Sequence, residues 1–177
     1  MGMPLPPLAT AEDMAAFGYE PVDDAVLLRA STRVRRYTRQ QITPGTSTTT
    51  LTGVGPWRLP QRPVTRVIEV KDKDGNRVRW ELRGSVLCSR SCAPLTVEYE
   101  HGMDPLPDAL VELVCQIASR IAATPAGLVA GVRTEQAGAE TITWGSDAYA
   151  ASSGLTDEEK EALDVLFPKL PRTVWLV

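Results

Sequence analysis

The chain has 177 residues, of which 43% are hydrophobic and 23% charged, a composition typical of one globular domain or of one domain with a small insert. The formal net charge of −3 excludes a general attraction of the whole surface to nucleic acid, and no apolar run is long enough to cross a bilayer, so no membrane partner is expected. Three cysteines and an N-terminus without a secretory signal predict reduced thiols in a cytosol.

Residues 10–42 predict two helices. Thr10 and Asp13 have the spacing of a capping box, which starts a short helix that ends near residues 17–18. A longer helix is expected from about Asp23 to Thr38, because apolar residues recur there at helical spacing. The residues expected on its apolar face are Val26, Ala30, Val34 and Tyr37.

Five arginines lie within eleven residues at the end of this second helix. They are Arg29, Arg33, Arg35, Arg36 and Arg39. One interpretation is a solvated flank whose charge suits the C-terminal end of a helix. The other is a basic surface that faces a polyanion or an acidic partner, because five arginines exceed what capping needs and arginine pairs well with carboxylates. Both interpretations stay open.

Residues 43–100 predict a small antiparallel sheet. The pair Asp74-Gly75 separates two alternating apolar runs, VTRVIEV and RVRWELR, and therefore indicates a hairpin. A further strand is expected at Leu95–Tyr99, where apolar and polar residues alternate. The residues expected on one side of the second hairpin strand are Val78, Trp80 and Leu82.

Helical patterns return in residues 105–167. Proline is favoured in a first helical turn, so Pro107 indicates the start of a long core helix. The residues on its apolar face are Leu110, Leu113, Val114, Ile117, Ala118 and Ile121. Thr156 and Glu159 form a second capping box at the start of a last helix, which turns Leu163, Leu166 and Phe167 inward.

The segment between these helices, residues 125–155, is rich in Gly and Ala and contains a strand-like piece at 140–144. A lone strand leaves backbone groups unpaired, so the piece is expected to pair with an adjacent copy of the chain. Glycine makes the segment costly to order, and order is therefore expected on assembly. These patterns together predict an α+β fold: a small helical bundle with an inserted antiparallel β-sheet and a long Gly/Ala-rich loop.

The metal-binding patterns are weak. Cys88, Cys92 and His101 have a poor spacing for a structural zinc site, and a sheet-edge loop with two free thiols is expected instead. Asp72 and Asp74 resemble the start of a calcium loop, but the glycine comes too early, so a hairpin turn is expected.

A catalytic set is equally weak. Ser89 or Ser91 could act as a nucleophile with His101 and Asp104, but no nucleophile-elbow motif is present, and a histidine at a strand end is more often a turn residue. The sequence therefore predicts no enzyme, no cofactor and no metal. A small cytosolic hydrolase and a monomeric binding module remain as alternatives.

Four stretches occur in a fixed order along the chain: LPQRPVTRVIEV (59–70), VEYEHGMDPLPDALVELVCQIASRIAA (97–123), GVRTEQAGAETITWG (131–145) and GLTDEEKEALDVL (154–166). Taken together they resemble the head-to-tail connector proteins (adaptor or head-completion proteins) of long-tailed phages. The loop of that family often has Tyr-Ser where this chain has Glu140-Thr141, and residues 43–58 and the tail at 168–177 match none of the family's sequence patterns.

The resemblance implies a structural virion protein with residues 1–177 as one connector domain. Twelve copies would form a ring under the portal at the head–tail interface, assembled in the host cytoplasm, and extend the DNA channel. The implied partners are sister copies, the portal protein, the next connector or tail protein, and packaged DNA in the lumen. The arginine flank would face the portal or the lumen. The residues assigned to subunit contact are Arg133, Glu135, Gly138, Ile142, Thr143 and Trp144 in the loop and Trp175 in the tail.

Overall fold

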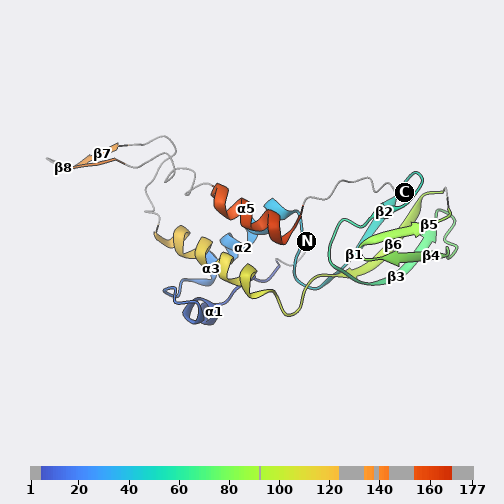
Figure 1. The fold of residues 1–177 in the computed structure, drawn as a ribbon, viewed down its shortest axis with the longest axis horizontal. Coiled ribbons are helices and arrows are strands. Elements are labelled where there is room, and N and C mark those ends of the chain that lie inside the picture. The colour runs from blue at the N-terminus through green and yellow to red at the C-terminus, as the bar shows by residue number, and fades with distance from the viewer. Residues whose placement is uncertain (1–4, 92, 124–133, 138–139, 144–153, 169–177) are drawn as a thin grey trace. The chain divides into compact units, whose positions relative to one another are not determined.

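The computed structural model describes residues 5–91, 93–123, 134–137, 140–143 and 154–168 (Figure 1). The chain divides into two compact units. We call the one built from residues up to 38 and from 107 to 168 the helical unit, and the one built from residues 39–106 the sheet unit. The predicted α+β class is confirmed, with antiparallel sheets inserted between helices. That residues 1–177 act as one connector domain stays a prediction.

The helical unit contains four described helices, in which the third is central. They are α1 (Ala11–Ala16), α2 (Asp24–Thr38), α3 (Asp108–Ala123) and α5 (Asp157–Leu166). Helix α3 packs against α1, α2 and α5, and α2 also packs against α5 (Figure 1). None of the described helices is long and apolar enough to span a membrane.

Both predicted capping boxes are confirmed. The Thr10 side chain accepts a hydrogen bond from the Asp13 backbone N–H at 3.1 Å, and Asp13 Oδ2 accepts one from the Thr10 N–H at 2.7 Å. Thr156 and Glu159 form the same reciprocal pair at the start of α5. Such a cap is worth about 1 kcal/mol, because it satisfies backbone donors that the first helical turn leaves unpaired.

The predicted apolar face of α3 is buried throughout, whereas the prediction of the apolar face of α2 was wrong in part. The buried residues of α2 are Leu27, Ala30, Ser31 and Val34, and Val26 and Tyr37 are only half-buried. The buried face of α2 includes Leu27 and the polar residue Ser31, whose hydroxyl makes hydrogen bonds on that side of the helix. This hydroxyl donates to the Leu27 carbonyl at 2.7 Å and accepts from the Leu8 N–H at 2.8 Å, which ties the N-terminal segment to the helix.

The sheet unit has two three-stranded antiparallel sheets, where a single sheet was predicted. The first has the order β1 (Gly45–Leu51), β6 (Leu95–His101), β3 (Val64–Asp72). The second has the order β2 (Trp57–Arg58), β5 (Val86–Ser89), β4 (Trp80–Arg83). One buried cluster joins them, consisting of Leu51, Leu59, Val67, Val70, Leu87, Leu95, Val97 and Tyr99.

The hairpin predicted around Asp74-Gly75 forms its turn, but the second strand does not stay paired with the first. The Asp72 carboxylate accepts hydrogen bonds from the N–H groups of Asp74 and Asn76, and Gly75 has a φ of 84°, which glycine tolerates best. The Val78 N–H still reaches the Val70 carbonyl at 3.1 Å. Beyond that point the chain enters β4, which pairs with β5 instead of β3, because a second tight turn follows β4 directly.

Two short strands, β7 (Thr134–Ala137) and β8 (Glu140–Thr143), form an antiparallel hairpin within the segment that links α3 to α5. The strand expected at 140–144 is therefore confirmed for residues 140–143.

Candidate interaction surfaces

The arginines near the end of α2 do not share one environment. Arg29 and Arg36 are exposed on α2, and Arg39 is exposed after the helix ends, with a φ of 57°. Arg33 and Arg35 are half-buried and donate hydrogen bonds within the helical unit, Arg33 Nη1 to the Gly154 carbonyl at 3.2 Å and Arg35 Nη2 to the Pro6 carbonyl at 2.7 Å. These two therefore have structural contacts that the sequence did not suggest, while contact of the arginines with DNA or portal stays a prediction.

A buried ion pair lies next to the Arg33 contact. Arg120 of α3 binds Glu159 of α5 through two parallel hydrogen bonds, Nε to Oε1 at 2.9 Å and Nη2 to Oε2 at 2.8 Å. Arg120 Nη2 also donates to the Gly154 carbonyl at 3.2 Å. The Glu159 side chain is only 4% exposed. We call Arg33, Arg120, Gly154 and Glu159 the Gly154 clamp.

The Gly154 clamp gathers positive charge around one carboxylate. Burial lowers the pKa of Arg33, and the neighbouring cations Arg120 and Arg29 lower it further, whereas Glu159 opposes the shift. Both guanidinium groups meet the same backbone carbonyl, so the chain is held where it joins the start of α5. The capping-box pattern predicted the capping role of Glu159, but no pattern in the sequence indicated its pairing with Arg120.

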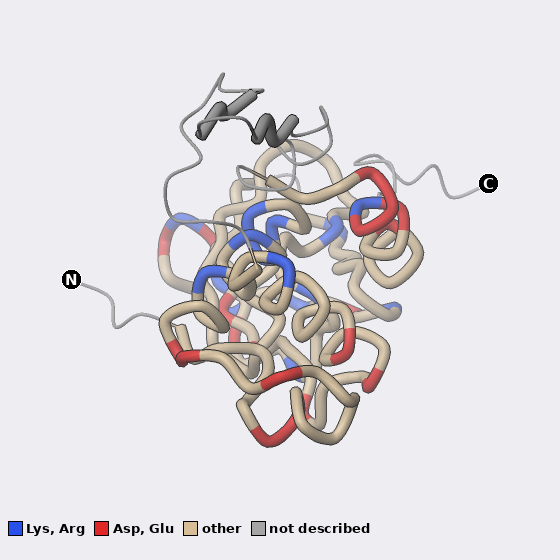
Figure 2. Tube along the Cα trace, turned by 90° about the vertical axis from the view of Figure 1, so that its left-hand side faces the viewer, with Lys and Arg blue, Asp and Glu red and all other residues tan. Residues whose placement is uncertain are grey.

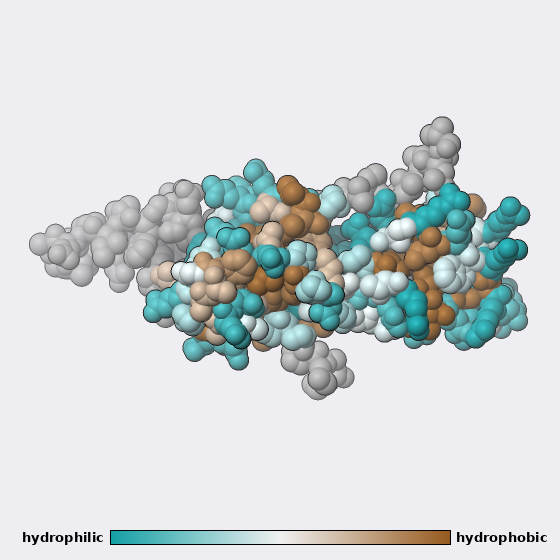
Figure 3. Space-filling view, turned by 60° about the horizontal axis from the view of Figure 1, so that its bottom comes forward, coloured by the Kyte–Doolittle hydropathy of each residue, from teal (hydrophilic) through white to brown (hydrophobic). Residues whose placement is uncertain are grey.

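The charge pattern of the whole chain is mixed. Figure 2 shows basic and acidic residues interspersed along the trace of the described residues, in keeping with the net charge of −3. Figure 3 shows hydrophobic surface on both units. The most exposed large hydrophobic side chains among the described residues are Leu5 and Phe17, Val54, Ile68, Trp80 and Val165.

The hairpin contains three of the residues assigned to subunit contact. Glu135 faces Ile142 in the pairing register, and Thr134 faces Thr143. The strand is not a lone one, because β8 pairs with β7 of its own chain, and its pairing with an adjacent copy stays a prediction. The two-stranded sheet still has two outer edges with no third strand in the described part of the chain. Four of the assigned residues, Arg133, Gly138, Trp144 and Trp175, lie outside the described residues.

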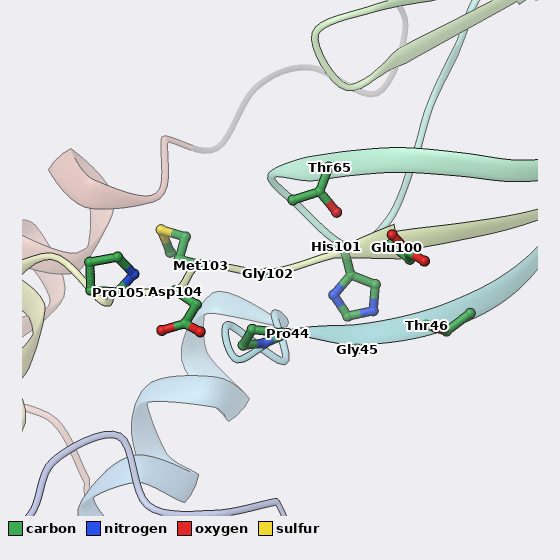
Figure 4. A pocket seen from close by; sticks show the side chains of 10 residues that line it. All are labelled: Pro44, Gly45, Thr46, Thr65, Glu100, His101, Gly102, Met103, Asp104 and Pro105. Atoms are coloured by element: carbon green, nitrogen blue, oxygen red, sulfur yellow. The ribbon is translucent and has the colours of Figure 1, made fainter.

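His101 lies at a hollow of about 620 Å³ in the sheet unit (Figure 4). It is the last residue of β6, not a turn residue as expected, and it is 2% exposed. Its Nε2 lies 2.9 Å from Ser47 Oγ, and its buried Nδ1 has no hydrogen-bond partner among the described residues. Burial lowers the pKa of His101, so the ring is neutral near pH 7. Gly102 follows it with a φ of 109°, and a Cβ there would come within 2.5 Å of the Thr43 carbonyl oxygen.

The structure does not assemble the catalytic set of the hydrolase alternative. His101 contacts Ser47, whereas the Ser89 hydroxyl donates to the Arg79 carbonyl at 3.1 Å and accepts from the Ser91 N–H at 3.2 Å. Asp104 lines the same hollow as His101, but its side chain does not point toward the ring in Figure 4. Among the described residues, the Ser47–His101 pair therefore lacks the third group that orients a catalytic histidine.

The thiols and acidic groups of the described residues form no cluster of three or more that could hold a metal ion. Cys92 lies outside the described residues, and Cys88 is a half-buried thiol. Cys115 is fully buried in α3, and burial raises its pKa to about 11. A thiol with such a pKa is a packing group with little reactivity.

No protein-family model matches the chain, and no curated protein sequence matches it. Its fold is similar to that of a chain in the neck of a native gene transfer agent (GTA) particle computed with C12 symmetry, with a TM-score of 0.50 and 17% identity over 94% of this chain and 91% of that one. Chains in the virion of a native GTA particle and in the neck of an empty GTA particle computed with C6 symmetry match with TM-scores of 0.49 and 0.47, each at 17% identity over 93% of this chain and 90% of the other. At this identity the likeness establishes the fold, and it agrees with the resemblance seen in the sequence.

Proposed function

We propose that the chain is a structural virion protein of a head-to-tail junction. Copies form a ring of twelve beneath the portal, extend the DNA channel, and present a surface to the next connector or tail protein, after assembly in the host cytoplasm. The observation that carries this proposal is a fold shared over 94% of the chain with a protein of a GTA neck computed with C12 symmetry. The ordered set of connector-like stretches supports it independently.

The geometry of the helical unit suits this role. Helix α3 and the Gly154 clamp hold the two ends of the segment that contains the hairpin, because α3 ends at Ala123 and the clamp fixes Gly154. A short hairpin whose flanking segments are held at the end of α3 and at the Gly154 clamp can contact a neighbouring subunit while the helices keep their packing. In a closed ring, the same contact repeats at every subunit, so modest contacts add up.

The exposed arginines provide a second contact. Arg29 and Arg36 project from α2, and Arg39 follows it. In this proposal they face packaged DNA or an acidic portal surface. Contact with DNA phosphates would make binding fall steeply with added salt.

Light scattering and electron microscopy of the purified chain, alone and with its portal, test the proposal. A ring is expected, and a chain that stays a single copy in both conditions contradicts it and favours the binding-module alternative. Trp144→Ala should impair assembly and leave the melting temperature of the single copy nearly unchanged. Trp80→Ala is the matched control, because Trp80 is a 37% exposed tryptophan of the sheet unit that should not affect the ring contact.

Hydrogen exchange gives an independent measure. Backbone amides of residues 131–145 should exchange quickly in the single copy and slowly in the ring, because the loop gains partners on assembly. Equal protection in both states would contradict the assignment of this segment to the interface.

A further inference from the structure

In the part of the chain that the structure describes, strand β1 presents an open sheet edge. It is an outer strand of its sheet and pairs with β6 over all seven of its residues without a bulge. On its other side, none of the backbone hydrogen bonds found among the described residues involves residues 45–51. Half of the backbone groups of an edge strand point outward, so β1 offers a continuous row of donors and acceptors.

The other edges of the sheet unit are protected, whereas no described residue protects the edge of β1. Strand β3 has two register shifts against β6 and carries charged residues, and its far end is covered by the bridge from Lys71 to Arg77. Strand β4 has only four residues, two of which are charged, and β2 has two residues. Bulges, charges and shortness are the usual means of preventing edge-to-edge pairing. Strand β1, with the sequence GTSTTTL, has none of them.

The composition of β1 also favours pairing. Four of its seven residues are threonines, which are β-branched and suit a strand. Thr46, Thr48 and Thr50 are exposed on one face, so an added strand would meet neutral hydroxyl and methyl groups. Threonine pairs across strands are favourable, and no like charges would oppose each other.

We propose that the β7–β8 hairpin of a neighbouring copy adds to β1, with β8 as the strand that makes contact. Strand β8 has the sequence ETIT, three of whose four residues are β-branched, and its outer edge is open in the described part of the chain. A two-stranded hairpin of four-residue strands is marginal by itself and gains stability from a larger sheet. Addition to β1 produces the strand order β7-β8-β1-β6-β3.

This inference rests on the proposed function, because it needs adjacent copies. It joins two different surfaces, a hairpin on one copy and a sheet edge on the next. Such a contact is heterologous and can close into a ring, whereas β1 paired with β1 would give a twofold dimer.

A charge placed on β1 tests whether β1 is the strand to which the hairpin adds. Thr48→Lys should raise the concentration needed for assembly by about tenfold or more, because an edge lysine hinders the approach of another strand. Thr96→Lys is the matched control, since Thr96 is an exposed threonine on the same face of the same sheet but in the central strand β6. Equal effects of the two substitutions on assembly, or no effect of Thr48→Lys, would overturn the proposal.

A mixture of two variants identifies which strand of the neighbouring copy pairs with β1. Thr48→Lys keeps the hairpin and blocks the edge, whereas Thr141→Pro keeps the edge and breaks β8. Each variant alone should remain a single copy, and an equimolar mixture should form pairs, because one intact hairpin meets one intact edge. If Thr141→Pro alone forms dimers, β1 pairs with β1 and the proposal fails.

Hydrogen exchange of β1 separates this inference from the proposed function. In the wild-type ring, amides of residues 45–51 should become at least about tenfold more protected than in the single copy. A ring that forms without added protection of β1 overturns the inference and leaves the proposed function intact. A chain that never assembles with itself or its portal overturns both.

Discussion

The sheet unit and the helical unit are built from the chain in opposite ways. The sheet unit uses one continuous stretch, residues 39–106, and its two sheets share a buried cluster that includes Tyr99. The helical unit combines two stretches separated by the sheet unit, and the Gly154 clamp joins α2, α3 and α5 across that separation. The stability of the first therefore depends on nearby apolar contacts, and that of the second also on a distant buried ion pair.

The largest effect is expected in the sheet unit. Tyr99→Ala removes a fully buried ring and the hydroxyl that accepts from the Gln61 N–H, and should lower the free energy of unfolding of that unit by about 4 kcal/mol. Denaturant unfolding with residue-level hydrogen exchange measures the two units separately. Thr96→Ala, an exposed change in the same strand, is the control. Equal destabilisation of the helical unit by Tyr99→Ala would mean that the two units unfold as one.

Loss of Glu159 should instead destabilise the helical unit. Glu159→Ala removes the buried carboxylate that pairs with Arg120 and half of a capping box, and should cost the helical unit about 3 kcal/mol. Glu158→Ala, an exposed change in the same turn of α5, should cost less than about 0.5 kcal/mol. If the two variants unfold at the same denaturant concentration, the clamp contributes little and the contrast between the units weakens.

Acid should weaken the sheet unit more than the helical unit. Burial lowers the pKa of His101 from its ordinary value of 6.5. Above that pH both states are neutral and His101 has no effect. Below it the unfolded chain binds a proton that the folded chain does not, so the free energy of unfolding falls by at most about 1.4 kcal/mol per pH unit until the folded pKa is reached.

Comparison of the wild type with His101→Gln isolates this contribution, because the other titrating groups are the same in both. The difference in stability between the two proteins should change with pH only below about 6.5. A difference that stays constant from pH 7 into the acid range would show that His101 is not the group responsible.

The smallest effect is a change in reactivity rather than stability. Burial raises the pKa of Cys115 to about 11, with the nearby Asp13 and Glu112 adding to the shift, so the native thiol should resist alkylation. Peptide mass spectrometry can follow it beside Cys88. Alkylation of Cys115 should accelerate in Glu159→Ala and stay slow in Tyr99→Ala. Acceleration by both variants would contradict independent units.

Much of the fold could be predicted because it depends on neighbours in sequence. The 3.6-residue period of α3 gave its buried face, and the two capping boxes need only residues three apart. The alternation in β6 likewise gave its buried side. The face of α2 was misjudged because a polar residue, Ser31, is buried there through hydrogen bonds to Leu27 and to a segment distant in sequence.

The candidate surfaces were predicted less completely. Sequence resemblance assigned Glu135, Ile142 and Thr143 to a contact loop, and the structure places them in a hairpin whose partner outside the chain stays a prediction. Nothing in the sequence singled out the pairing of Arg120 with Glu159, or the contact between Ser47 and His101. These pairs are 39 and 54 residues apart, and no local pattern records such a distance.

The sequence by itself determined the described helices and the strands β3, β4, β6 and β8, since periodicity, caps and turn residues act over a few neighbouring positions. Only the tertiary structure decided how the strands divide into two sheets, which edge stays open among the described residues, and which buried charges meet. Those outcomes depend on which distant segments come together, because a backbone edge or a buried arginine is satisfied by any partner of suitable geometry that the fold brings near it.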